Sequence, residues 1–573
     1  MPSKRTTPKR RSKAAVPPPT VQHAGDRVFI LDIPYRTTAP GAQWVPAWKT
    51  HAYVGAALPD PLRPFASQPY SYQRWIEDDL NAVPGEPMRD VAAKTPRQEQ
   101  IDGAAAIVTA HRAGARQFLL ADDPGTGKTI TMILAAQTIA QERATPSAIP
   151  KILVTVDRPF VITAPHWRAS IASVGDGGCR WLICSPDQLR KLLARNGQPR
   201  YSFDAQIYDE SQLYRHQDTK RVTAMRRIAR YSADHAKAPF LINATATPGH
   251  NPAELTYLAP AFAQLHNQPT SAWNDLGQRL VDAGLPLAKR YDRWQWDENA
   301  TASGRLQQEA SDQVRRWLTD ATPPLMLHRP SPQGQAPIDG MPTTLTAEQR
   351  AAYSAEWGDF QRDMGLARRG NNVAKGRAAI MRFRQKAGML RIRATAEWAS
   401  AQVDADRQVA LSVEFVSTAA GPLCDELAGM KIPYSSIYGS GTFDTEAERI
   451  AFQTGRTKVC VFTVASSISL HAGEMLPGGT HASRTPRVGV LHQPSYSGIA
   501  TRQRLGRTHR DGQVSEWWLA YAEDTIEEQI AHIQLDRLRA TTNAVGGETS
   551  ALHKIAALLG ADWLPEDALT NGD

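Results

Sequence analysis

A glycine-rich stretch, ADDPGTGKT at residues 121–129, separates an apolar segment from a segment with helical periodicity. In this context the backbone N–H groups of a glycine turn and of a helix N-terminus converge on phosphates. Lys128 supplies a positive charge for the β- and γ-phosphates, and the Thr129 hydroxyl is a ligand for Mg²⁺. The general pattern GxxxxGK[ST] has glycine where Asp122 stands. The predicted nucleotide-binding residues of this loop are Asp123, Pro124, Gly125, Thr126, Gly127, Lys128 and Thr129.

Two adjacent carboxylates follow a later apolar strand, in AQIYDESQ at residues 205–212. Asp209 and Glu210 come at the carboxyl end of this strand, where an isolated pair is most often a solvated turn. Because this pair is placed one strand after a phosphate loop, we predict that it takes part in hydrolysis of the nucleotide. Asp209 is expected to hold Mg²⁺ through water, and Glu210 to orient and deprotonate the attacking water.

A third chemical cluster, QRLGRTHRDGQ, occupies residues 503–513. Arg507 and Arg510 are three residues apart, so on a helix they would share one face and reach a γ-phosphate presented by another lobe. An arginine that completes charge neutralisation in this way contributes roughly 10³–10⁵ in rate. The alternative for this segment alone is an exposed Arg-rich helix.

In order, these three stretches resemble motifs I, II and VI of superfamily two helicases, specifically the Swi/Snf-like DNA translocases. The resemblance implies roles in ATP binding for Gln100, in TPRQEQIDGA, and for Gln503. Segments resembling motif Ia (151–167), the stretch before the acidic box (183–192) and motif III (243–255) follow in the family's order. In motif III, Thr245 and Thr247 are expected to couple the nucleotide to nucleic acid.

The resemblance continues through the second half and covers roughly residues 94–535. It includes 345–353, 380–388, 437–455 and 524–530. It implies a fold of two RecA-like lobes, with ATP and Mg²⁺ as cofactors and DNA, duplex or branched, as the partner.

Two departures from the family pattern concern coupling between the sites. Gln212 replaces the histidine of the acidic box, although glutamine can still donate a hydrogen bond. In TVASSISLHAG, Ser467 and Ser469 stand where motif V is rich in glycine. The DNA-coupling loop is therefore in question, whereas the hydrolytic residues are intact.

The elements that must position these residues follow an α/β pattern. From about Lys94, helices alternate with short apolar strands, which is typical of parallel sheets covered by helices. A first series predicts strands at 117–121, 151–156, 180–184, 205–209 and 239–244, with helices at 101–114 and 128–142. A second predicts strands at 408–416, 434–439, 458–464 and 488–493, with helices at 421–430, 444–453 and from Gly498.

The expected organisation has six parts, consistent with roughly 100–200 residues per domain. They are a disordered basic tail (1–25), a small β-rich module (26–90), the first RecA-like lobe (91–265), a mainly helical connecting region (266–400), the second lobe (401–545) and a C-terminal tail (546–573). In the small module, Trp44, Trp48 and Tyr53 either contact nucleic acid or pack a core. The stretch GAQWVPAWKTHAYVG loosely resembles hairpins that precede some phage and annealing-helicase motors.

Composition excludes several classes of protein. The chain has 573 residues, 42% of them hydrophobic and 21% charged, as in globular proteins. No apolar run approaches the ~20 residues that span a bilayer, and no signal-peptide core is evident. The four cysteines form no CxxC, so a reducing, cytoplasmic and DNA-associated setting is expected, in a bacterial host if the chain is phage-encoded.

The net charge of +9 is unevenly distributed. The first twenty residues carry +6 and residues 361–393 carry +9, so the rest is acidic. The tail is either a solubilising segment or a nucleic-acid-binding arm. The second cluster is either a solvated helical face or a phosphate-contacting surface; the residues predicted to contact nucleic acid are Arg368, Arg369, Lys375 and Arg377.

Three functions remain open at this stage. The first is an ATP-dependent DNA translocase or helicase of replication, recombination or repair. The second is an RNA-dependent helicase of the same superfamily, and the third is a DNA-binding scaffold in which the altered motif V has uncoupled the ATPase.

Overall fold

The computed structural model describes most of the chain from residue 27 onward. The described residues are 27–31, 33, 41–45, 50–55, 58–59, 62, 65, 76, 79–85, 91, 93–145, 147–157, 160–215, 219–231, 238–246, 248–249, 251–290, 293–297, 299–300, 304–331, 333–438, 445–463, 468–476, 480–493, 495–539, 547–564 and 568–569. The predicted tail at 1–25 lies outside them. The chain divides into two compact units, Met1–Ala82 and Val83–Asp573.

The first unit contains a three-stranded antiparallel sheet. Its strands, in the order β1-β3-β2, are β1 (Arg27–Leu31), β2 (Gln43–Val45) and β3 (Thr50–Gly55). Tyr53 packs against a small core that includes Leu31 and Leu62, and the half-buried Trp44 meets the ring of His51 edge-on at 5.1 Å. The β-rich module is confirmed, and core packing is the role of Tyr53. Trp48 lies outside the described residues.

The second unit begins with a six-stranded, wholly parallel sheet. Its strands, in the order β11-β4-β8-β7-β5-β6, are β4 (Gln117–Leu120), β5 (Lys151–Thr155), β6 (Arg180–Cys184), β7 (Ala205–Asp209), β8 (Phe240–Ala244) and β11 (Met326–Leu327). The five strands predicted for this lobe are confirmed. β11 was missed because it has only two residues, too few for a periodic signal.

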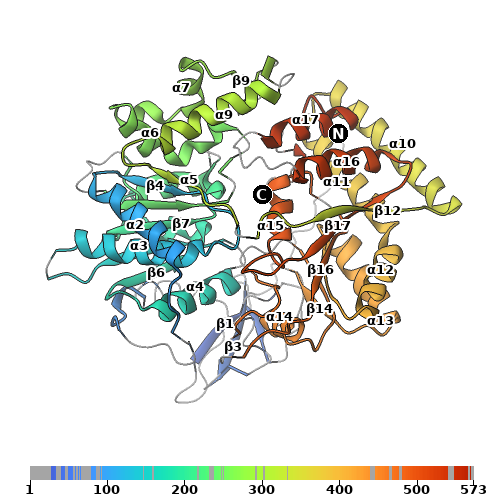
Figure 1. Cartoon of the computed structure of the whole chain (residues 1–573), viewed down its shortest axis with the longest axis horizontal. Helices are drawn as coiled ribbons and strands as arrows, with labels where there is room; N and C mark the ends of the chain where they lie inside the picture. The colour runs from blue at the N-terminus through green and yellow to red at the C-terminus, as the bar shows by residue number, and fades with distance from the viewer. Residues whose placement is uncertain are drawn as a thin grey trace, which may run out of the picture. The chain divides into compact units, whose positions relative to one another are not determined.

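Helices surround this first sheet (Figure 1). They are α2 (Gln98–Arg112), α3 (Lys128–Arg143), α4 (Phe160–Val174), η2 (Pro186–Leu192), η3 (Ser211–Tyr214), α5 (Lys220–Ile228), η5 (Pro252–Leu258) and α6 (Ala259–Leu265). Further along, η6 (Thr270–Trp273), α7 (Leu276–Asp282) and α9 (Gly304–Thr319) accompany a hairpin of β9 (Leu287–Arg290) and β10 (Arg293–Trp296).

The second lobe is another six-stranded parallel sheet. Its strands, in the order β12-β17-β16-β13-β15-β14, are β12 (Ile338–Thr343), β13 (Gln408–Ser412), β14 (Tyr434–Ile437), β15 (Val459–Phe462), β16 (Arg487–Leu491) and β17 (Glu516–Ala522). The four predicted strands are confirmed, whereas β12 and β17 at one edge were not anticipated. The mainly helical region 266–400 therefore also supplies one strand to each sheet.

Alternate residues of these strands enter two cores on opposite faces of the sheet. Val409 and Leu411 join one core, whereas Ala410 between them joins the other. Burial on both faces makes each strand a continuous apolar run, which is why the sequence revealed them. The flanking helices are α12 (Ile392–Asp404), η7 (Val416–Ala420), α13 (Gly421–Gly429), α14 (Thr445–Gln453), α15 (Gly498–Leu505) and α16 (Ile526–Arg539).

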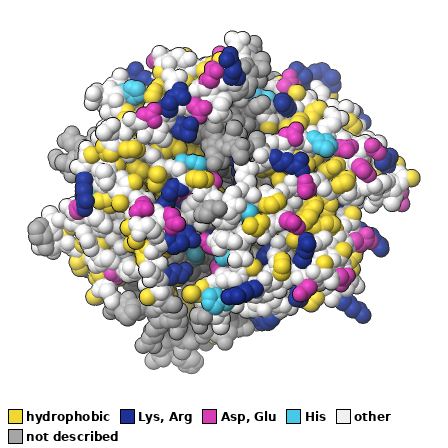
Figure 2. Space-filling model, viewed as in Figure 1, with side chains coloured by type: hydrophobic (Ala, Val, Ile, Leu, Met, Phe, Trp, Pro, Cys, Tyr) yellow, Lys and Arg dark blue, Asp and Glu magenta, His cyan; other side chains and the backbone are white. Residues whose placement is uncertain are grey.

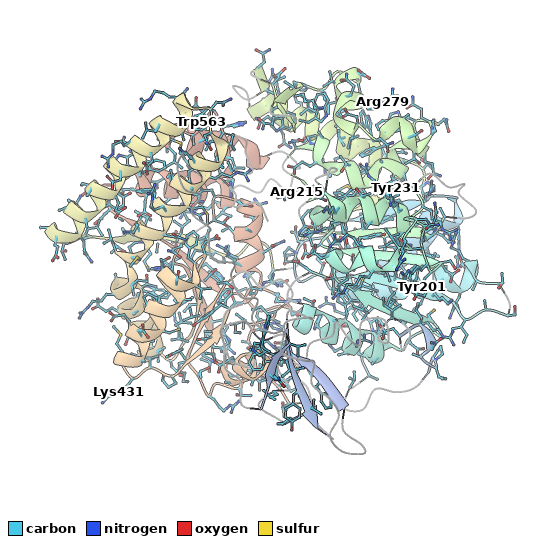
Figure 3. The ribbon with its side chains drawn as sticks, turned by 180° about the vertical axis from the view of Figure 1, so that it is seen from behind. Tyr201, Arg215, Tyr231, Arg279, Lys431 and Trp563 are labelled. Atoms are coloured by element: carbon cyan, nitrogen blue, oxygen red, sulfur yellow. The ribbon has the colours of Figure 1, made fainter. Side chains whose placement is uncertain are left out.

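A third core joins the two long helices that precede the second lobe to the end of the chain. These helices are α10 (Ala347–Arg369) and α11 (Val373–Met389), and the region predicted as a C-terminal tail contains α17 (Gly547–Leu558). Trp563, labelled in Figure 3, lies against α11, where a Cβ on Gly376 would come within 3.2 Å of its ring. The C-terminal segment is therefore a packed part of the fold, because Leu552 and Ile555 are fully buried.

The described residues contain no helix long and apolar enough to cross a membrane. The four cysteines are buried.

A buried ion pair between α12's N-terminus and α16 yields a stability prediction. Arg391 is 1% exposed, and its guanidinium contacts the carboxylate of Glu527 and the carbonyl of His492. Removing the charge of Glu527 leaves this guanidinium buried without its counter-charge. We expect Glu527→Gln to lower the free energy of unfolding by about 3–5 kcal/mol in urea titration.

The matched control is Glu397→Gln, which removes the partner of Arg393 in an exposed pair on α12. Its effect on the free energy of unfolding should be small, because solvent screens this exposed pair. Equal destabilisation in the two variants would contradict the prediction.

Candidate functional site

The glycine-rich loop connects β4 to α3, as the sequence predicted. Gly125 and Gly127 adopt φ values of 85° and 84°, in the left-handed region that favours glycine. Gly127 is the N-cap of α3, so the first N–H groups of that helix point back into the loop. The loop therefore has the backbone shape of an anion-binding turn.

Lys128 lies within this loop and turns its ammonium inward. Its Nζ donates to the carbonyl oxygens of Asp122 at 2.7 Å and Asp123 at 3.1 Å. Burial lowers the pKa of Lys128, against the opposing negative charges of Glu210, Asp122 and Asp209. The Thr126 hydroxyl also donates to the carbonyl of Asp123, at 2.9 Å, which closes the turn.

Asp209 and Glu210 lie at the carboxyl end of β7. The indole Nε1 of the buried Trp167 donates to Asp209 Oδ2 at 3.0 Å. Burial and the adjacent charge of Glu210 raise the pKa of Asp209 to about 7. Burial and the charge of Asp157 also raise the pKa of Glu210. Both carboxylates thus lie in a setting where their charged forms need a counter-charge.

The backbone and neighbours of Glu210 fix its direction. Its φ of 54° places it in the left-handed region, which non-glycine residues rarely adopt. Gln212, which stands in place of the family's histidine, donates from Nε2 to Glu210 Oε2 at 2.7 Å. The glutamine therefore does supply the hydrogen bond expected of it, and it does so to the predicted base.

The second lobe reaches the same place through residues 503–511. Gln503 Nε2 lies 3.5 Å from Glu210 Oε2. A Cβ on Gly506 would lie 3.1 Å from Pro124, and a Cβ on Gly125 would lie 3.1 Å from Arg510 Cβ. These contacts bring residues about 300 to 400 positions apart in the sequence onto one loop.

The expected helical placement of Arg507 and Arg510 is wrong. Helix α15 ends at Leu505, and the chain then turns through Asp511 and Gly512, whose φ values are 53° and 80°. Arg510 lies against Gly125 of the phosphate loop, whereas Arg507 lies within the influence of Glu210, so the two arginines reach the site without sharing a helix face.

Arg507 is buried, and the negative charges of Glu210 and Asp157 act on its guanidinium. Its Nη1 donates to the carbonyl of Ile468 at 3.2 Å. Burial and the positive charge of Arg510 lower the pKa of Arg507 to about 10, whereas the charge of Glu210 raises it. The guanidinium therefore interacts with Glu210 across the two lobes.

Gln100 lies against the loop at the start of α2. Its Oε1 accepts from the Arg97 N–H at 2.9 Å, while its Nε2 faces Gly127, where a Cβ would collide with it. Arg97 donates to the carbonyls of Gly125 at 3.5 Å and Thr126 at 3.1 Å. Sequence reasoning missed Arg97, although its place directly beside the glutamine segment was a signal.

A second cross-lobe contact involves motif V. Arg97 Nη1 lies 3.7 Å from Asp511 Oδ1, and His471 Nε2 lies 3.6 Å from Asp511 Oδ2. The hydroxyl of Ser469 lies 2.6 Å from His471 Nδ1. Ser469, one of the two serines in place of glycine, thus orients the histidine that faces the second-lobe turn. Ser467 lies outside the described residues.

The residues predicted to meet nucleic acid lie in two places. Thr245 is 1% exposed at the end of β8, so its burial speaks against direct contact with a phosphate chain. Thr247 lies outside the described residues. Arg368, Arg369, Lys375 and Arg377 surround the turn between α10 and α11.

Much of the basic cluster at 361–393 is neutralised. Seven of its ten bases lie within 4 Å of a carboxylate in the described part of the chain. Among them, Arg368 lies 3.6 Å from Asp562. Arg369 and Lys375 are exposed at the turn. On the face of the molecule that Figure 2 shows, basic and acidic side chains are likewise interspersed.

The loop and the carboxylates fit a nucleotide with Mg²⁺. The glycine turn leaves no room for a Cβ at Gly127, the ammonium of Lys128 is held by carbonyls alone, and Thr129 and Asp209 offer the oxygen ligands that Mg²⁺ prefers. Among the described residues, no group of three or more His, Cys, Asp or Glu side chains could hold a metal ion.

Comparison with protein-family models finds no match, and neither does comparison with curated proteins. Among solved structures, the chain is similar to the SWI2/SNF2 ATPase core of Sulfolobus solfataricus in complex with dsDNA, with 16% identity and a TM-score of 0.30 over 78% of this chain and 92% of that one. The SWI2/SNF2 ATPase core domain of that organism shows 16% identity and a TM-score of 0.30, covering 83% and 98%. The Hef helicase domain of Pyrococcus furiosus shows 14% identity and a TM-score of 0.42, covering 76% and 97%.

Because the identities are 14–16% and the TM-scores are below 0.5, these similarities add no argument about function. The chain's own sheets define its fold: two parallel six-stranded sheets with flanking helices are two RecA-like lobes, as the sequence predicted.

The raised pKa of Asp209 predicts how stability depends on pH. The carboxyl titrates near pH 7 in the fold, against its ordinary value of 3.8. Between these values the folded chain holds a proton that the unfolded chain has lost, so stability falls as pH rises and stays lower above pH 7. We expect Asp209→Asn, without metal, to melt at a higher temperature than the wild type at pH 8, with the difference vanishing toward pH 4.

The comparison variant is Asp404→Asn, which removes an exposed carboxylate at the end of α12, away from the site. A melting difference for Asp209→Asn that is the same at pH 4 and pH 8 would contradict the assigned environment.

Two positive-φ glycines, one in the loop and one after α2, provide a second prediction. An alanine in this region of φ costs roughly 1–2 kcal/mol. Gly127→Ala should in addition weaken binding of a fluorescent ATP analogue by about tenfold or more, because its methyl group would displace Gln100. Gly114 has a φ of 90° and open space around it, so Gly114→Ala should reduce stability alone. Wild-type affinity in Gly127→Ala would refute the predicted contact.

Proposed function

We propose that this chain is an ATP-dependent DNA translocase or helicase. The single observation that supports this most is that both lobes converge on one loop: Gly506 and Arg510 of the second lobe pack on the phosphate loop, and Gln503 reaches Glu210. Residues separated in this way can sense cleft closure, so hydrolysis can be coupled to relative movement of the lobes.

Each residue of the site has a proposed task. The loop N–H groups and Lys128 bind the phosphates, and Gln100 contributes to base recognition. Thr129 and Asp209 hold Mg²⁺, Asp209 through water, and the ion neutralises phosphate charge when bound. Glu210 takes the proton of the attacking water, and its raised pKa makes its carboxylate a stronger base. Arg507 and Arg510 stabilise the charge that develops on the transferred phosphoryl group.

When the two lobes close around the site, bulk water is excluded from these charges. The hydrogen bonds from Gln212 and Gln503 hold the Glu210 carboxylate in one orientation, which reduces the reorganisation needed when it accepts a proton. The hydrogen bond of Gln503 comes from the second lobe, so the base is fully oriented only when the lobes are together.

The proposal is tested by steady-state ATPase assays with duplex, forked and single-stranded DNA and with RNA. We expect stimulation by DNA above stimulation by RNA. Lys128→Ala should lower the stimulated rate by about 10²-fold or more, and Glu210→Gln should lower it by at least that factor with ATP binding preserved. Binding of ATP and DNA without stimulation would favour a scaffold, and stronger stimulation by RNA would favour an RNA-dependent helicase.

The turn between α10 and α11 is the proposed phosphate-binding surface outside the cleft. Replacing Arg369 and Lys375 by glutamine should weaken DNA binding and reduce the dependence of log affinity on log salt by about one for every phosphate that the variant no longer neutralises. The matched control is Arg362→Gln with Arg393→Gln, since both arginines pair with acids on their own helices. An equal effect in both double variants would mean that the turn is only a solvated face.

A further inference from the structure

Residues 328–331 follow β11 of the first sheet and contact the phosphate loop. Among them, Arg329 meets Asp122, the residue that occupies the glycine position of the general loop pattern. The Asp122 carboxylate is fully buried, accepts from the Arg329 N–H and Nε at 2.8 Å each, and also contacts Nη2. A carboxylate bound by three charge-assisted or backbone hydrogen bonds is held in one orientation.

The same guanidinium touches the two helices that frame the nucleotide site. It contacts the carbonyl of Glu99 on α2 and lies 3.4 Å from the Thr131 hydroxyl on α3. A Cβ on Gly103 would lie 2.7 Å from Nη1, so α2 leaves room for the guanidinium only because that residue is glycine. Arg329 therefore links the loop to the first turns of both helices.

Asp123, the next residue of the loop, is also held by this segment. Its Oδ2 accepts from the Ser331 N–H at 3.0 Å, and its Oδ1 lies 3.4 Å from His328 Nε2. Its own N–H donates to the carbonyl of Arg329 at 3.0 Å. Burial raises the pKa of Asp123, but the hydrogen bonds from His328 and Ser331 outweigh it and the pKa is lowered. The carboxylate is thus stabilised in its charged form.

The two residues held in this way also supply the carbonyls that now bind Lys128. A phosphate ligand would draw the ammonium away, and the carbonyls would then be without their donor. With their side chains fixed by the segment, the two residues cannot follow the lysine. Further along the chain, the carbonyl of Gly334 lies 3.2 Å from His509 Nε2 in the second lobe.

We propose that Arg329 is a positioning residue of the ATP site, which fixes the phosphate loop through Asp122 and belongs to the same connection as Gly334, whose carbonyl faces His509 of the second lobe. The proposal rests on the proposed function, since it concerns ATP binding at that loop. In the general loop pattern the first residue is a conformationally free glycine. Here that residue is Asp122, and Arg329 fixes its position through hydrogen bonds.

The first test measures ATPase kinetics of Arg329→Lys, which keeps the charge but removes the planar fork. We expect the KM for ATP to rise about tenfold with kcat at saturating ATP within threefold of the wild type, because the variant weakens binding common to ground and transition states. A purely structural defect would reduce the active fraction, and therefore kcat, at unchanged KM. The control is Arg112→Lys, whose arginine forks onto Glu142 on the exposed surface of the same two helices.

A second variant, Asp122→Asn with Arg329→Gln, removes both charges and keeps similar shapes, so it remains informative if the lysine variant does not fold. It too should raise the KM. Hydrogen exchange of the wild type is a third measurement that requires no substitution. A non-hydrolysable ATP analogue with Mg²⁺ should increase protection of the Arg329 and Ser331 amides together with that of the loop.

An unchanged KM in a folded variant, or protection confined to residues 121–131, would overturn the role of Arg329. These outcomes differ from failure of the proposed function itself, in which the wild type would show neither binding of the analogue nor ATPase activity.

Discussion

The charge balance around Lys128 is the constraint on which the rest of the site depends. Asp122, Asp123, Asp209 and Glu210 all act on this one ammonium, in a space where burial penalises charge. One lysine cannot compensate four carboxylates, so further positive or hydrogen-bonding groups must come from elsewhere. The linker after β11 supplies Arg329 and the second lobe supplies arginines. The parts of the chain therefore meet at the loop partly for electrostatic reasons.

The departures from the general phosphate-loop pattern and from the family pattern have a physical explanation in this setting. Asp122 replaces glycine but is matched by an arginine, and Gln212 replaces histidine but still donates to Glu210. Ser469 replaces glycine and orients His471 toward Asp511. Each change substitutes one hydrogen-bonding arrangement for another and leaves the predicted hydrolytic residues in place. The coupling elements are altered in detail, and their lobes still touch.

Prediction from the sequence worked best where a local pattern determines the outcome. The buried strands of both sheets are continuous apolar runs, because helices cover both faces, and nine of them were located from that feature alone. The loop and the acidic pair were found because their chemistry needs particular residues directly beside a strand end. The pairing of β11 and β12 with distant strands was not foreseen. β11 has only two residues, and β12 contains Gly340 and Pro342, which interrupt the apolar pattern of a strand.

What the sequence by itself determined is the class of fold and the identity of the chemical groups, because residue type and spacing along one strand or turn are local properties. What only the tertiary structure decided is which groups share a charge environment. Arg329 is 207 residues from Asp122, and Gln503 is 293 residues from Glu210. The helical placement of Arg507 and Arg510 failed for the same reason, since a turn with positive φ and contacts from another lobe set their positions. Which charged groups interact depends on their distance in space, and separation along the sequence does not give that distance.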